Sequence, residues 1–359
     1  MQRRQTRQIA IGPVKIGACA PISIQTMTKT DTADVAATLD QIRSVAALGC
    51  DIVRLAVPDM EAAQALAAIC PASPIPVVAD IHFDARLAVT AIESGVSAIR
   101  INPGNMADMD AVRNVVDKAA SAGIPIRIGL NSGSVRRRGE KVQSEFELAD
   151  LMVDRALEYA RQFESWGFAD TKISLKASTA EATIYAYRKI APLCDYPLHV
   201  GVTATGPHEY AVVKSAVGIG ALLSEGIGDT IRVSLSGPPE DEVRIGREIL
   251  ASLGLLTLPY EVISCPTCGR ASLDVAAMAR TVEEAVRSLP LHGGKTIRIA
   301  VMGCEVNGPG EAADADVGIA CGVDSGLLFI RGAKVRKVSS EQIVATLISE
   351  ARKLLASNS

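Results

Sequence analysis

Short apolar runs rich in β-branched residues alternate with longer segments of helical period between about residues 21 and 253. The predicted strands are residues 21–27, 51–57, 76–81, 98–103, 124–130, 171–177, 198–204 and 229–236. A helix is predicted after each strand, for example over residues 34–48, 84–94 and 211–224. Strands and helices that alternate in this way indicate an α/β fold built on a parallel sheet.

Eight such units within about 250 residues predict a (β/α)8 TIM-type barrel, whose active site lies at the C-terminal ends of the strands. An open doubly wound sheet is the alternative. It is disfavoured because the loop at residues 28–32 lacks the glycine-rich phosphate fingerprint of a dinucleotide fold. Residues 7–17, with turn residues Gly12 and Pro13, predict a small hairpin before the barrel.

The pattern changes beyond residue 255, where short strands and two longer helices follow one another without a low-complexity linker. Helices are predicted over residues 273–289 and 341–355, and strands over residues 295–302, 317–321 and 327–330. We therefore expect two domains. A barrel that binds substrate covers residues 1–255, and a smaller α+β domain covers residues 256–359.

Net charge and the lengths of the apolar runs limit the classes of function that the chain can have. The formal net charge is -3, so the chain has no global positive field for nucleic acid, and any attraction for anions must come from local clusters. No apolar run suits a signal peptide after the basic segment 1–7, and none approaches the length of a membrane span. We expect a cytoplasmic protein whose eight cysteines are reduced thiols rather than disulfides.

Three cysteines and a glutamate of the smaller domain form a candidate metal site. Cys265 and Cys268 have the spacing of a metal-binding pair, and Cys304 follows a predicted strand. Residues 308–310 read Gly-Pro-Gly and predict a tight turn that would bring Glu311 back toward the sulfurs. Three thiolates and a carboxylate could then converge on one metal group.

The identity of that group is open between an iron–sulfur cluster and structural zinc. A closed zinc site usually takes four Cys or His ligands, for which His292 or Cys321 would have to join. Three thiolates suit a cubane cluster, with the carboxylate as a weaker and more exchangeable fourth ligand, so iron–sulfur is favoured. Four cysteines have no second cysteine at a metal-binding spacing, and we predict that they are core residues. They are Cys19, Cys50, Cys70 and Cys194.

Several predicted barrel strands carry basic or amide residues where a buried strand should hold Val, Ile or Leu. They are Arg54, Arg100, Asn102, Arg127, Asn131, Lys172, Lys176, His199 and Arg232. The same strands supply few carboxylates beyond Asp51 and Asp80, so a positive excess remains for an anion to neutralise. A phosphorylated substrate is favoured over a scaffold of ion pairs. We expect the run Arg136 to Arg138 to lie in a solvated loop. The alternatives are a lid over the site and a docking patch for an electron donor.

Two segments of the smaller domain resemble the cluster motifs of bacterial 4-hydroxy-3-methylbut-2-enyl diphosphate synthases. They read Cys265-Pro-Thr-Cys268-Gly-Arg and Val301-Met-Gly-Cys304-Glu-Val-Asn-Gly-Pro-Gly-Glu311. The resemblance covers nearly the whole chain, through residues 24–28, 51–54, 79–82, 99–105, 172–178 and 223–229. It implies an iron–sulfur oxidoreductase of the non-mevalonate isoprenoid pathway.

The resemblance also implies the chemistry of the site. A [4Fe–4S] cluster would be held by Cys265, Cys268, Cys304 and an exchangeable Glu311, in an iron–sulfur domain. The barrel would bind 2-C-methyl-D-erythritol 2,4-cyclodiphosphate for reductive ring opening and dehydration, with flavodoxin or ferredoxin as electron donor and a homodimer as the assembly. The expected catalytic residues are Glu311, Asp80 and His82. The expected substrate-binding residues are Arg54, Arg100, Asn102, Arg127, Asn131, Lys172, Ser174, Lys176, His199, Arg232 and Ser234.

One segment departs from the family's pattern. The seventh strand of the family ends Thr-Glu-Ala-Gly, whereas this chain reads Thr203-Ala204-Thr205-Gly206 and lacks that carboxylate. His208 or Glu209, just downstream, could supply the proton instead. The alternative is a non-catalytic metal protein whose barrel binds a phosphorylated metabolite, as a sensor does.

Overall fold

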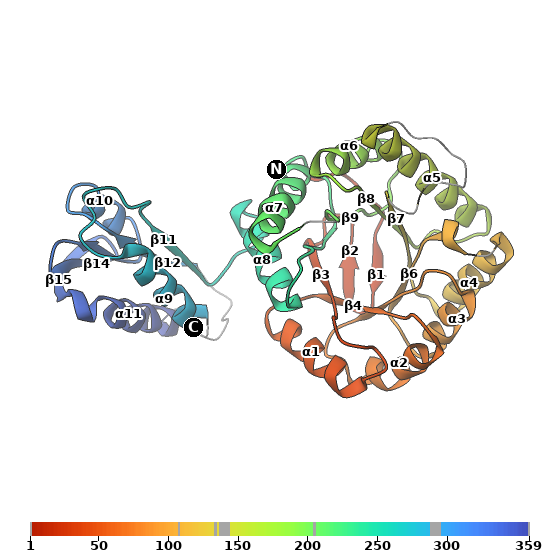
Figure 1. Ribbon diagram of the computed structural model, residues 1–359, viewed down its shortest axis with the longest axis horizontal. Coiled ribbons are helices and arrows are strands. Elements are labelled where there is room, and N and C mark those ends of the chain that lie inside the picture. The colour runs from red at the N-terminus through yellow and green to blue at the C-terminus, as the bar shows by residue number, and fades with distance from the viewer. Residues whose placement is uncertain are drawn as a thin grey trace. The chain divides into compact units, whose positions relative to one another are not determined.

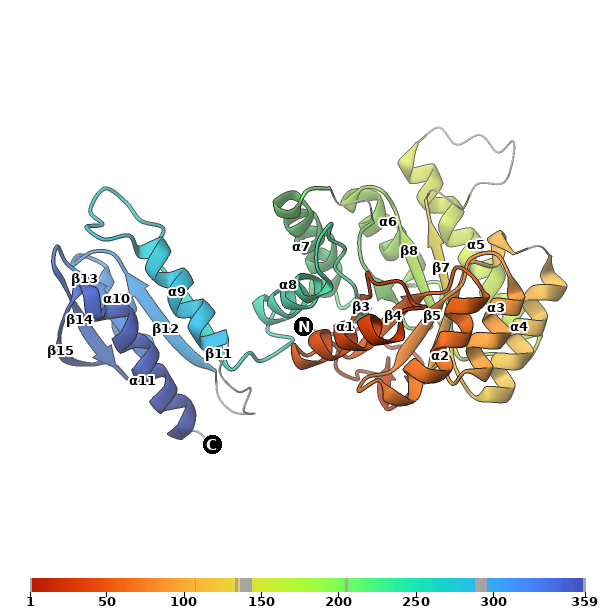
Figure 2. The ribbon, with the colours of Figure 1, turned by 60° about the horizontal axis from the view of Figure 1, so that its bottom comes forward.

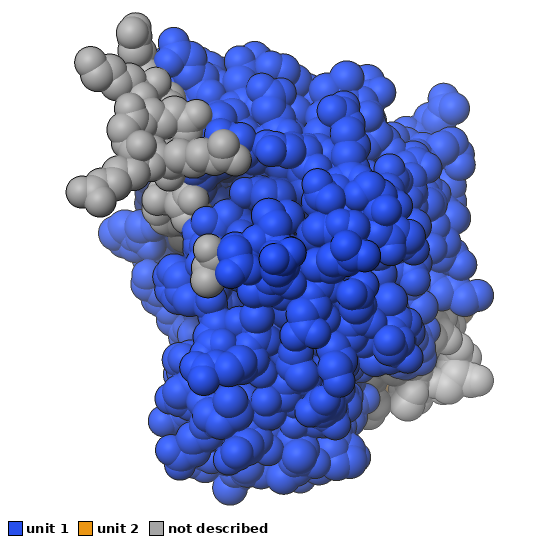
Figure 3. Space-filling view, turned by 90° about the vertical axis from the view of Figure 1, so that its right-hand side faces the viewer, with its two compact units in different colours: residues 1–255 blue, residues 256–359 orange. Residues whose placement is uncertain are grey.

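The chain forms two compact units, residues 1–255 and 256–359. The computed structural model describes residues 2–106, 108–132, 135, 144–203, 206–287 and 296–357, with side chains to residue 354. Figure 3 shows the outer surface of the first unit, on the side where its helices α3 (Ala85–Glu93) and α4 (Met109–Ala122) lie in Figure 1. Each unit has its own sheet and its own core, so each is treated separately.

The first unit is a parallel barrel with its helices on the outside (Figure 1). Its strands are β3 (Ser23–Met27), β4 (Ile52–Ala56), β5 (Val77–Asp80), β6 (Ala98–Ile101), β7 (Ile126–Asn131), β8 (Thr171–Lys176), β9 (His199–Val200) and β10 (Thr230–Ile231). They pair in the order β8-β7-β6-β5-β4-β3-β10-β9, and a parallel bridge from Ile173 to Leu198 joins the two ends. The predicted (β/α)8 fold is confirmed.

The remaining helices of the barrel alternate with these strands. They are α1 (Val35–Ala47), α2 (Met60–Ala72), α5 (Glu145–Ser165), α6 (Ala180–Ile190), α7 (His208–Ser224) and α8 (Pro239–Ser252). Several start at an aspartate that follows a strand. Asp34, Asp59 and Asp108 each accept a hydrogen bond from the backbone N–H three residues later, which satisfies a donor of the first helical turn. The chain therefore turns into each of these helices close to the carboxyl end of the preceding strand.

The predicted hairpin before the barrel is present, and it closes the end of the barrel where the strands begin. Strands β1 (Ile9–Ile11) and β2 (Val14–Ile16) pair antiparallel, with Ile9 opposite Ile16. In Figure 1 both strands lie inside the ring of barrel strands. Ile9, Ile11 and Ile16 pack in one cluster with Ile52, Val78 and Ala98, which lie near the starts of their strands. The hairpin therefore forms an apolar floor, and the carboxyl ends of the strands lie opposite it.

The second unit has a mixed five-stranded sheet between helices (Figure 2). The strands are β11 (Tyr260–Ser264), β12 (Ile297–Met302), β13 (Val317–Cys321), β14 (Ser325–Ile330) and β15 (Ala333–Ser339), in that spatial order. The first three are parallel, and β14 and β15 continue antiparallel. Helices α9 (Val275–Arg287) and α11 (Ile343–Ser357) pack on one face, and α10 (Gly308–Ala313) packs on the other.

The prediction of a tight turn at residues 308–310 is wrong, because α10 begins there. Pro309 lies in the first helical turn, where its missing N–H removes a donor that would have no partner within the helix. Gly308 packs closely, since an added Cβ would lie 3.1 Å from Cβ of Met302 and 3.3 Å from Cβ of Ala320. Glu311 therefore lies in the first turn of a short helix. Within the part of the chain that the structure describes, no helix is both long and apolar enough to cross a membrane.

The floor of the barrel makes a testable prediction. Ile16→Ala empties a fully buried site and should lower the free energy of unfolding of the barrel by about 2–4 kcal/mol. Urea unfolding followed by far-ultraviolet circular dichroism measures this loss. Lys15→Ala, at an exposed position of the same strand, should change stability by less than about 0.5 kcal/mol. Equal stability of the two variants would show that the hairpin is not part of the barrel core.

Candidate functional site

Polar side chains of the barrel strands share one face. In β8 the polar residues Lys172, Ser174 and Lys176 occupy alternate positions, and Ile173 and Leu175 between them are fully buried. Alternate residues of a strand point to the same side, and the other side of a barrel strand packs on helices. The polar series of β8 therefore faces the interior of the barrel.

Adjacent strands place their charged residues in register. Asp80 is paired with Arg100, Arg100 with Arg127, and Arg127 with Lys172. All four residues are at least 94% buried. One further pair, Asn131 with Lys176, lies closer to the carboxyl ends of β7 and β8. These four charged side chains thus form one level inside the barrel. Asn131 and Lys176 belong to a second polar level, nearer the carboxyl ends of the strands.

An open pocket lies over these levels. It encloses about 570 Å³, counting the space at its mouth. Its lining combines five basic side chains, one carboxylate, one imidazole and four neutral polar groups. The lining residues are Arg54, Asp80, His82, Arg100, Arg127, Asn131, Ser174, Lys176, Thr203, Arg232 and Ser234. All of these except Thr203 belong to the predicted site. The eleven lining residues come from seven different barrel strands or from the first three residues after them.

Asp80 is the carboxylate of the pocket wall. Its Oδ1 lies 3.0 Å from Nη1 of Arg100, and its Oδ2 lies 3.7 Å from both Nε of Arg54 and Nε2 of His82. Burial opposes ionisation of Asp80, but Arg54, the hydrogen bond with His82, Arg100 and Arg127 outweigh it and hold its pKa well below the usual range. Asp80 is therefore a carboxylate at neutral pH, and it fixes two arginines.

The pocket keeps an excess of positive charge. Among the described residues, neither Arg127 nor Lys176 forms an ion pair, and Arg127 donates only to the neutral Oε1 of Gln25, at 3.2 Å. Burial, followed by repulsion from Arg232 and other arginines, holds the pKa of Lys176 well below its usual value. An arginine keeps its proton in proteins, so the cost at Arg127 remains as uncompensated charge. A polyanion in the pocket would relieve both.

Glu242 is a second carboxylate of the site that the sequence did not reveal. It lies on α8, is 1% exposed, and approaches Arg232 at 3.3 Å and Lys29 at 2.9 Å. Thr26 and the backbone N–H of Leu235 also donate to it. This network orients Arg232 at the edge of the pocket.

Two glycines make room for the cations. A Cβ on Gly129 of β7 would collide with Nε of Arg100, which crosses that strand and donates to the Gly129 carbonyl at 2.8 Å. A Cβ on Gly201 would lie 3.1 Å from Nζ of Lys176 and would collide with the carbonyl of Arg232. These positions need glycine because a charged side chain or the backbone passes directly over them.

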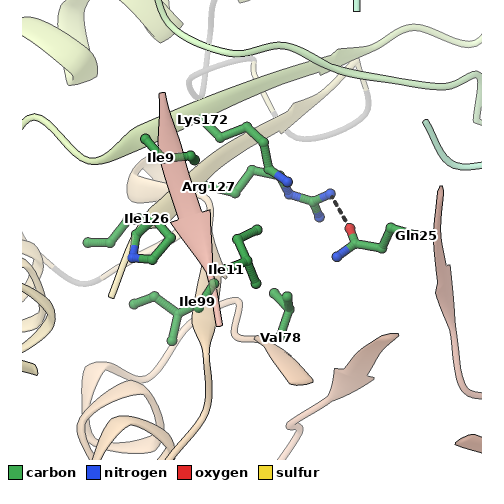
Figure 4. Close-up of a pocket in the computed structure, with 10 residues that line it drawn as sticks. Ile9, Ile11, Gln25, Val78, Ile99, Ile126, Arg127 and Lys172 are labelled. Atoms are coloured by element: carbon green, nitrogen blue, oxygen red, sulfur yellow. Dashed lines mark hydrogen bonds between the residues drawn. The ribbon is translucent and has the colours of Figure 1, made fainter. Parts of the chain in front are cut away.

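Three of the predicted substrate-binding residues do not line this pocket. Lys172 belongs to the same level as Arg127 but lines a small cavity toward the floor, together with Arg127 and the hairpin residues Ile9 and Ile11 (Figure 4). Its Nζ donates to Thr230 at 3.2 Å, and burial, followed by repulsion from Arg127, holds its pKa well below the usual value. Figure 4 also shows the bond between Arg127 and Gln25 beside this cavity.

His199 and Asn102 are the other two. His199 is fully buried, and burial followed by the nearby Arg127 and Lys176 holds its pKa well below the usual value, so it is neutral. Asn102 is 1% exposed, and its Oδ1 accepts a hydrogen bond at 3.2 Å from the backbone N–H of Gly104, at the start of a short 3-10 helix. Contact of these residues with substrate stays a prediction.

Two of the predicted metal ligands, Cys265 and Cys304, lie at the same end of the second sheet. Cys265 directly follows β11, and Cys304 follows the adjacent parallel strand β12 by two residues. The sulfur of Cys265 accepts a hydrogen bond from the backbone N–H of Gly303 at 3.2 Å. Cys268 is exposed, and Glu311 lies in the first turn of α10. Among the described residues, no three Cys, His, Asp or Glu side chains are gathered closely enough to hold a metal ion.

The chemistry of these sulfurs nevertheless suits a thiolate-bound group. Hydrogen bonds from the backbone N–H groups of Asn307 and Val306 lower the pKa of Cys304, and the charge of Arg270 lowers it further. Burial, together with the nearby Cys265, instead raises the pKa of Cys321 to about 11. Cys304 thus suits a thiolate ligand, whereas Cys321 is a core thiol of strand β13. His292, the other candidate fourth ligand, lies outside the described residues, as do Ala204 and the run Arg136 to Arg138.

His208 and Glu209, the candidate substitutes for the family's carboxylate, begin α7 and are both exposed. Neither is among the residues that line the pocket. Thr203 does line it, one position before Ala204. Its place at the end of a barrel strand was the signal that could have found it.

A (β/α)8 barrel with a basic pocket at the carboxyl ends of its strands, followed by a cysteine-bearing α+β unit, defines a two-domain barrel enzyme. The family model described as GcpE TIM-barrel domain matches residues 6–247, and the model described as GcpE protein C-terminal domain matches residues 261–353. The chain belongs to the GcpE family. The predicted family and the prediction of an enzyme are confirmed.

Curated relatives cover nearly the whole chain. The 4-hydroxy-3-methylbut-2-en-1-yl diphosphate synthase (flavodoxin) of Salinispora arenicola strain CNS-205 is 50% identical over 353 residues, 98% of this chain and 89% of that protein. The protein of the same name from Ruminiclostridium cellulolyticum is 50% identical over 352 residues, 98% of each chain. The dihydropteroate synthase of Yersinia pestis has a TM-score of 0.51 at 11% identity, over 69% of this chain and 98% of that one, and shows the barrel fold alone.

The low pKa of Asp80 makes a prediction about stability. Asp80→Asn leaves Arg54 and Arg100 buried without their counter-charge and should cost about 3 kcal/mol near neutral pH. A depressed carboxyl pKa stabilises the fold above the unfolded pKa of about 3.9, and this contribution is lost as the pH falls through the folded pKa. Urea unfolding at several pH values should therefore show the gap between wild type and variant closing below about pH 4. Asp110→Asn, at an exposed position, is the control, and an equal loss there would contradict the prediction.

The low pKa of Lys176 makes a prediction about binding. A bound polyanion should raise that pKa, so the complex takes up protons and the affinity falls as the pH rises. Titration calorimetry with inorganic diphosphate, in two buffers of different ionisation enthalpy at about pH 8, measures the uptake. Lys176→Met should bind more weakly and take up fewer protons than wild type. Equal proton uptake by both proteins would rule out Lys176 as the group that titrates.

Proposed function

We propose that the chain converts 2-C-methyl-D-erythritol 2,4-cyclodiphosphate to 4-hydroxy-3-methylbut-2-enyl diphosphate in isoprenoid biosynthesis. The single observation that supports this most is the basic pocket, whose five cations face one lining carboxylate. A cyclic diphosphate supplies the missing negative charge, and arginine forks suit its oxygens. The relatives of about 50% identity carry the name of this synthase. In neutral acid forms, ring opening consumes two electrons and two protons and releases one water.

The barrel residues would bind and orient the diphosphate. Arg127 and Lys176 have no internal counter-ion among the described residues, whereas Asp80 holds Arg54 and Arg100 in place. Asn131, Ser174 and Ser234 line the same pocket as neutral donors. The basic side chains are already desolvated in the free protein, so binding would not have to desolvate them. The rigid strands that carry them would fix the orientation of the ring.

His82 would handle the proton of the reaction. Its Nε2 lies 2.9 Å from Nη1 of Arg100 and 3.7 Å from Oδ2 of Asp80, so both groups orient the ring. The side chain is 41% exposed at the pocket, so it can reach a bound ligand. We assign His82 the role of proton donor, with Asp80 holding the arginine that orients it.

Cys265, Cys268, Cys304 and Glu311 would hold a [4Fe–4S] cluster in the second unit. When bound, such a cluster supplies single electrons and a Lewis-acidic iron. The lowered pKa of Cys304 and the exposure of Cys268 suit these residues to a thiolate-bound group. Glu311 would be the weakest of the four ligands because it is a carboxylate. Flavodoxin or ferredoxin would deliver the electrons, and a homodimer would be the working assembly.

A second candidate is a sensor that binds the cyclodiphosphate without converting it. Ala204, at the position where the family carries glutamate, is the observation that favours it. Anaerobic reconstitution with iron and sulfide, followed by electron paramagnetic resonance of the reduced protein with and without the cyclodiphosphate, tests the site. A spectrum that changes with substrate, together with turnover, supports the synthase. The same change without turnover supports the sensor, and a colourless zinc protein contradicts both the cluster and the synthase.

The role of Glu311 yields a separate prediction. Glu311→Ala removes the carboxylate but keeps three thiolates, so iron and sulfide content should stay near wild type while turnover falls by about 10–100-fold or more. Iron and sulfide analysis and product assay measure the two effects. Glu341→Ala, at an exposed position of the same unit, should change neither. A fully active Glu311→Ala protein would refute the ligand role.

A further inference from the structure

The hairpin of β14 and β15 carries an unusual concentration of positive charge. Residues 325–339, here called the basic hairpin, contain Arg331, Lys334, Arg336 and Lys337 and no acidic residue. All four basic residues are exposed, and β15 is the edge strand of the sheet. The whole chain has a net charge of -3, so this local excess stands against an overall negative protein. Charge of one sign on one surface attracts a partner of the opposite sign.

These charges are not used inside the second unit. Among the described residues, no ion pair or side-chain hydrogen bond engages Lys334, Lys337, Arg336 or Arg331, although other arginines of the unit, such as Arg298, are paired. Exposed ion pairs contribute little to stability, and unpaired charges of one sign repel one another. The basic hairpin therefore has no evident role in holding the fold together, and its free charge is available to a partner.

A β-bulge sets the direction of two of the lysines. Lys337 pairs with Leu327 and Lys334 pairs with Phe329, and the register shifts between Leu328 and Phe329. Residues three apart in a regular strand point to opposite faces, but the extra residue of a bulge brings them to the same face. Leu327 and Phe329 pack on the face that α10 covers. Lys334 and Lys337 therefore project on the side of the sheet where α10 carries Glu311.

Lys337 lies in line with the cysteine-bearing end of the sheet, and Lys334 lies two register positions farther from it. Met302, Ala320, Leu327 and Lys337 are successive register partners across β12, β13, β14 and β15. Three strand spacings separate the first from the last, about 14 Å. Cys304 follows Met302 by two residues. A protein seated on Lys334 and Lys337 would therefore lie close to the predicted cluster ligands.

We propose that the basic hairpin is the docking surface for an acidic electron-carrier protein. The proposal rests on the proposed function, because that reaction consumes electrons from outside the chain. Each docked carrier is oxidised by one electron, and two dockings supply the two electrons of ring opening. Charge complementarity selects the partner class and speeds the encounter. The curated relatives include the word flavodoxin in their names, which is the kind of carrier meant.

Lysines on an edge strand also have a simpler use, since they discourage pairing with another chain. Charge reversal separates the two roles. A glutamate discourages edge-to-edge pairing as well as a lysine does, so Lys334→Glu/Lys337→Glu should stay folded and monodisperse. If edge protection were the only role of these lysines, the variant would also bind flavodoxin as wild type does. The matched control is Arg280→Glu/Arg352→Glu. It has the same change in charge at exposed positions of α9 and α11, on the opposite face of the sheet.

The test compares the three reconstituted holoenzymes. Association with a purified bacterial flavodoxin is followed by surface plasmon resonance at several salt concentrations. Turnover of the cyclodiphosphate is measured with reduced flavodoxin and with dithionite. The Lys334/Lys337 variant should bind about tenfold more weakly or worse, chiefly through a slower association rate and a flatter salt dependence. Its turnover with dithionite should stay within about twofold of wild type.

Each outcome either supports or contradicts the proposed docking surface. Unchanged flavodoxin binding by the Lys334/Lys337 variant overturns the proposal, and so does an equal loss in the Arg280/Arg352 control, which would mean that only net charge matters. A loss confined to the Lys334/Lys337 variant supports it. If wild type lacks turnover with either reductant, the proposed function fails, while the binding measurement still decides the docking surface.

Discussion

The ion pairs of Asp80 with Arg54 and Arg100 are the interaction on which the barrel site depends. Without that carboxylate, five cations would face one another in a pocket where each is largely buried. Asp80, together with Glu242 beside Arg232, cannot balance all five, so the site is compensated only in part. The uncompensated charge of Arg127 costs stability in the free protein and gives affinity for a polyanion, and the same positive surroundings lower the pKa of Lys176. Stability and function therefore oppose each other at this level of the barrel.

The shape of the barrel follows from accommodating these side chains. The isoleucines of the β1–β2 hairpin fill one end, so the long basic side chains have space only toward the other end. Gly129 and Gly201 provide that space, because any side chain there would meet Arg100 or Lys176. A wider apolar filling, as is usual in barrels of this kind, would leave no room for a ligand. The floor and the glycines are thus as necessary to the pocket as its charges.

The sequence revealed the strands and their polar positions because both are local patterns. Period-two alternation in residues such as Lys172, Ser174 and Lys176 places them on one face before any tertiary contact is known. The alternation does not show how deep in the barrel each side chain lies. The predicted site therefore includes Lys172 and His199, which do not line the pocket. Glu242 was missed because it reaches Arg232 from a helix that follows in the chain, and its helical surroundings resemble any charged surface turn. The turn expected before Glu311 failed because Gly-Pro-Gly also suits a helix start.

Both units use the same structural rule. In the barrel, the chemically active side chains gather where parallel strands end, because backbone groups and side chains beyond the last strand pair are free to meet a ligand. The parallel strands β11 and β12 end at Cys265 and Cys304 in the same way. There the free N–H groups of residues 306 and 307 stabilise the thiolate of Cys304, whereas Cys321, still inside a strand, has a raised pKa. The position of a cysteine relative to the strand end, rather than its spacing alone, thus decides whether it suits a ligand role.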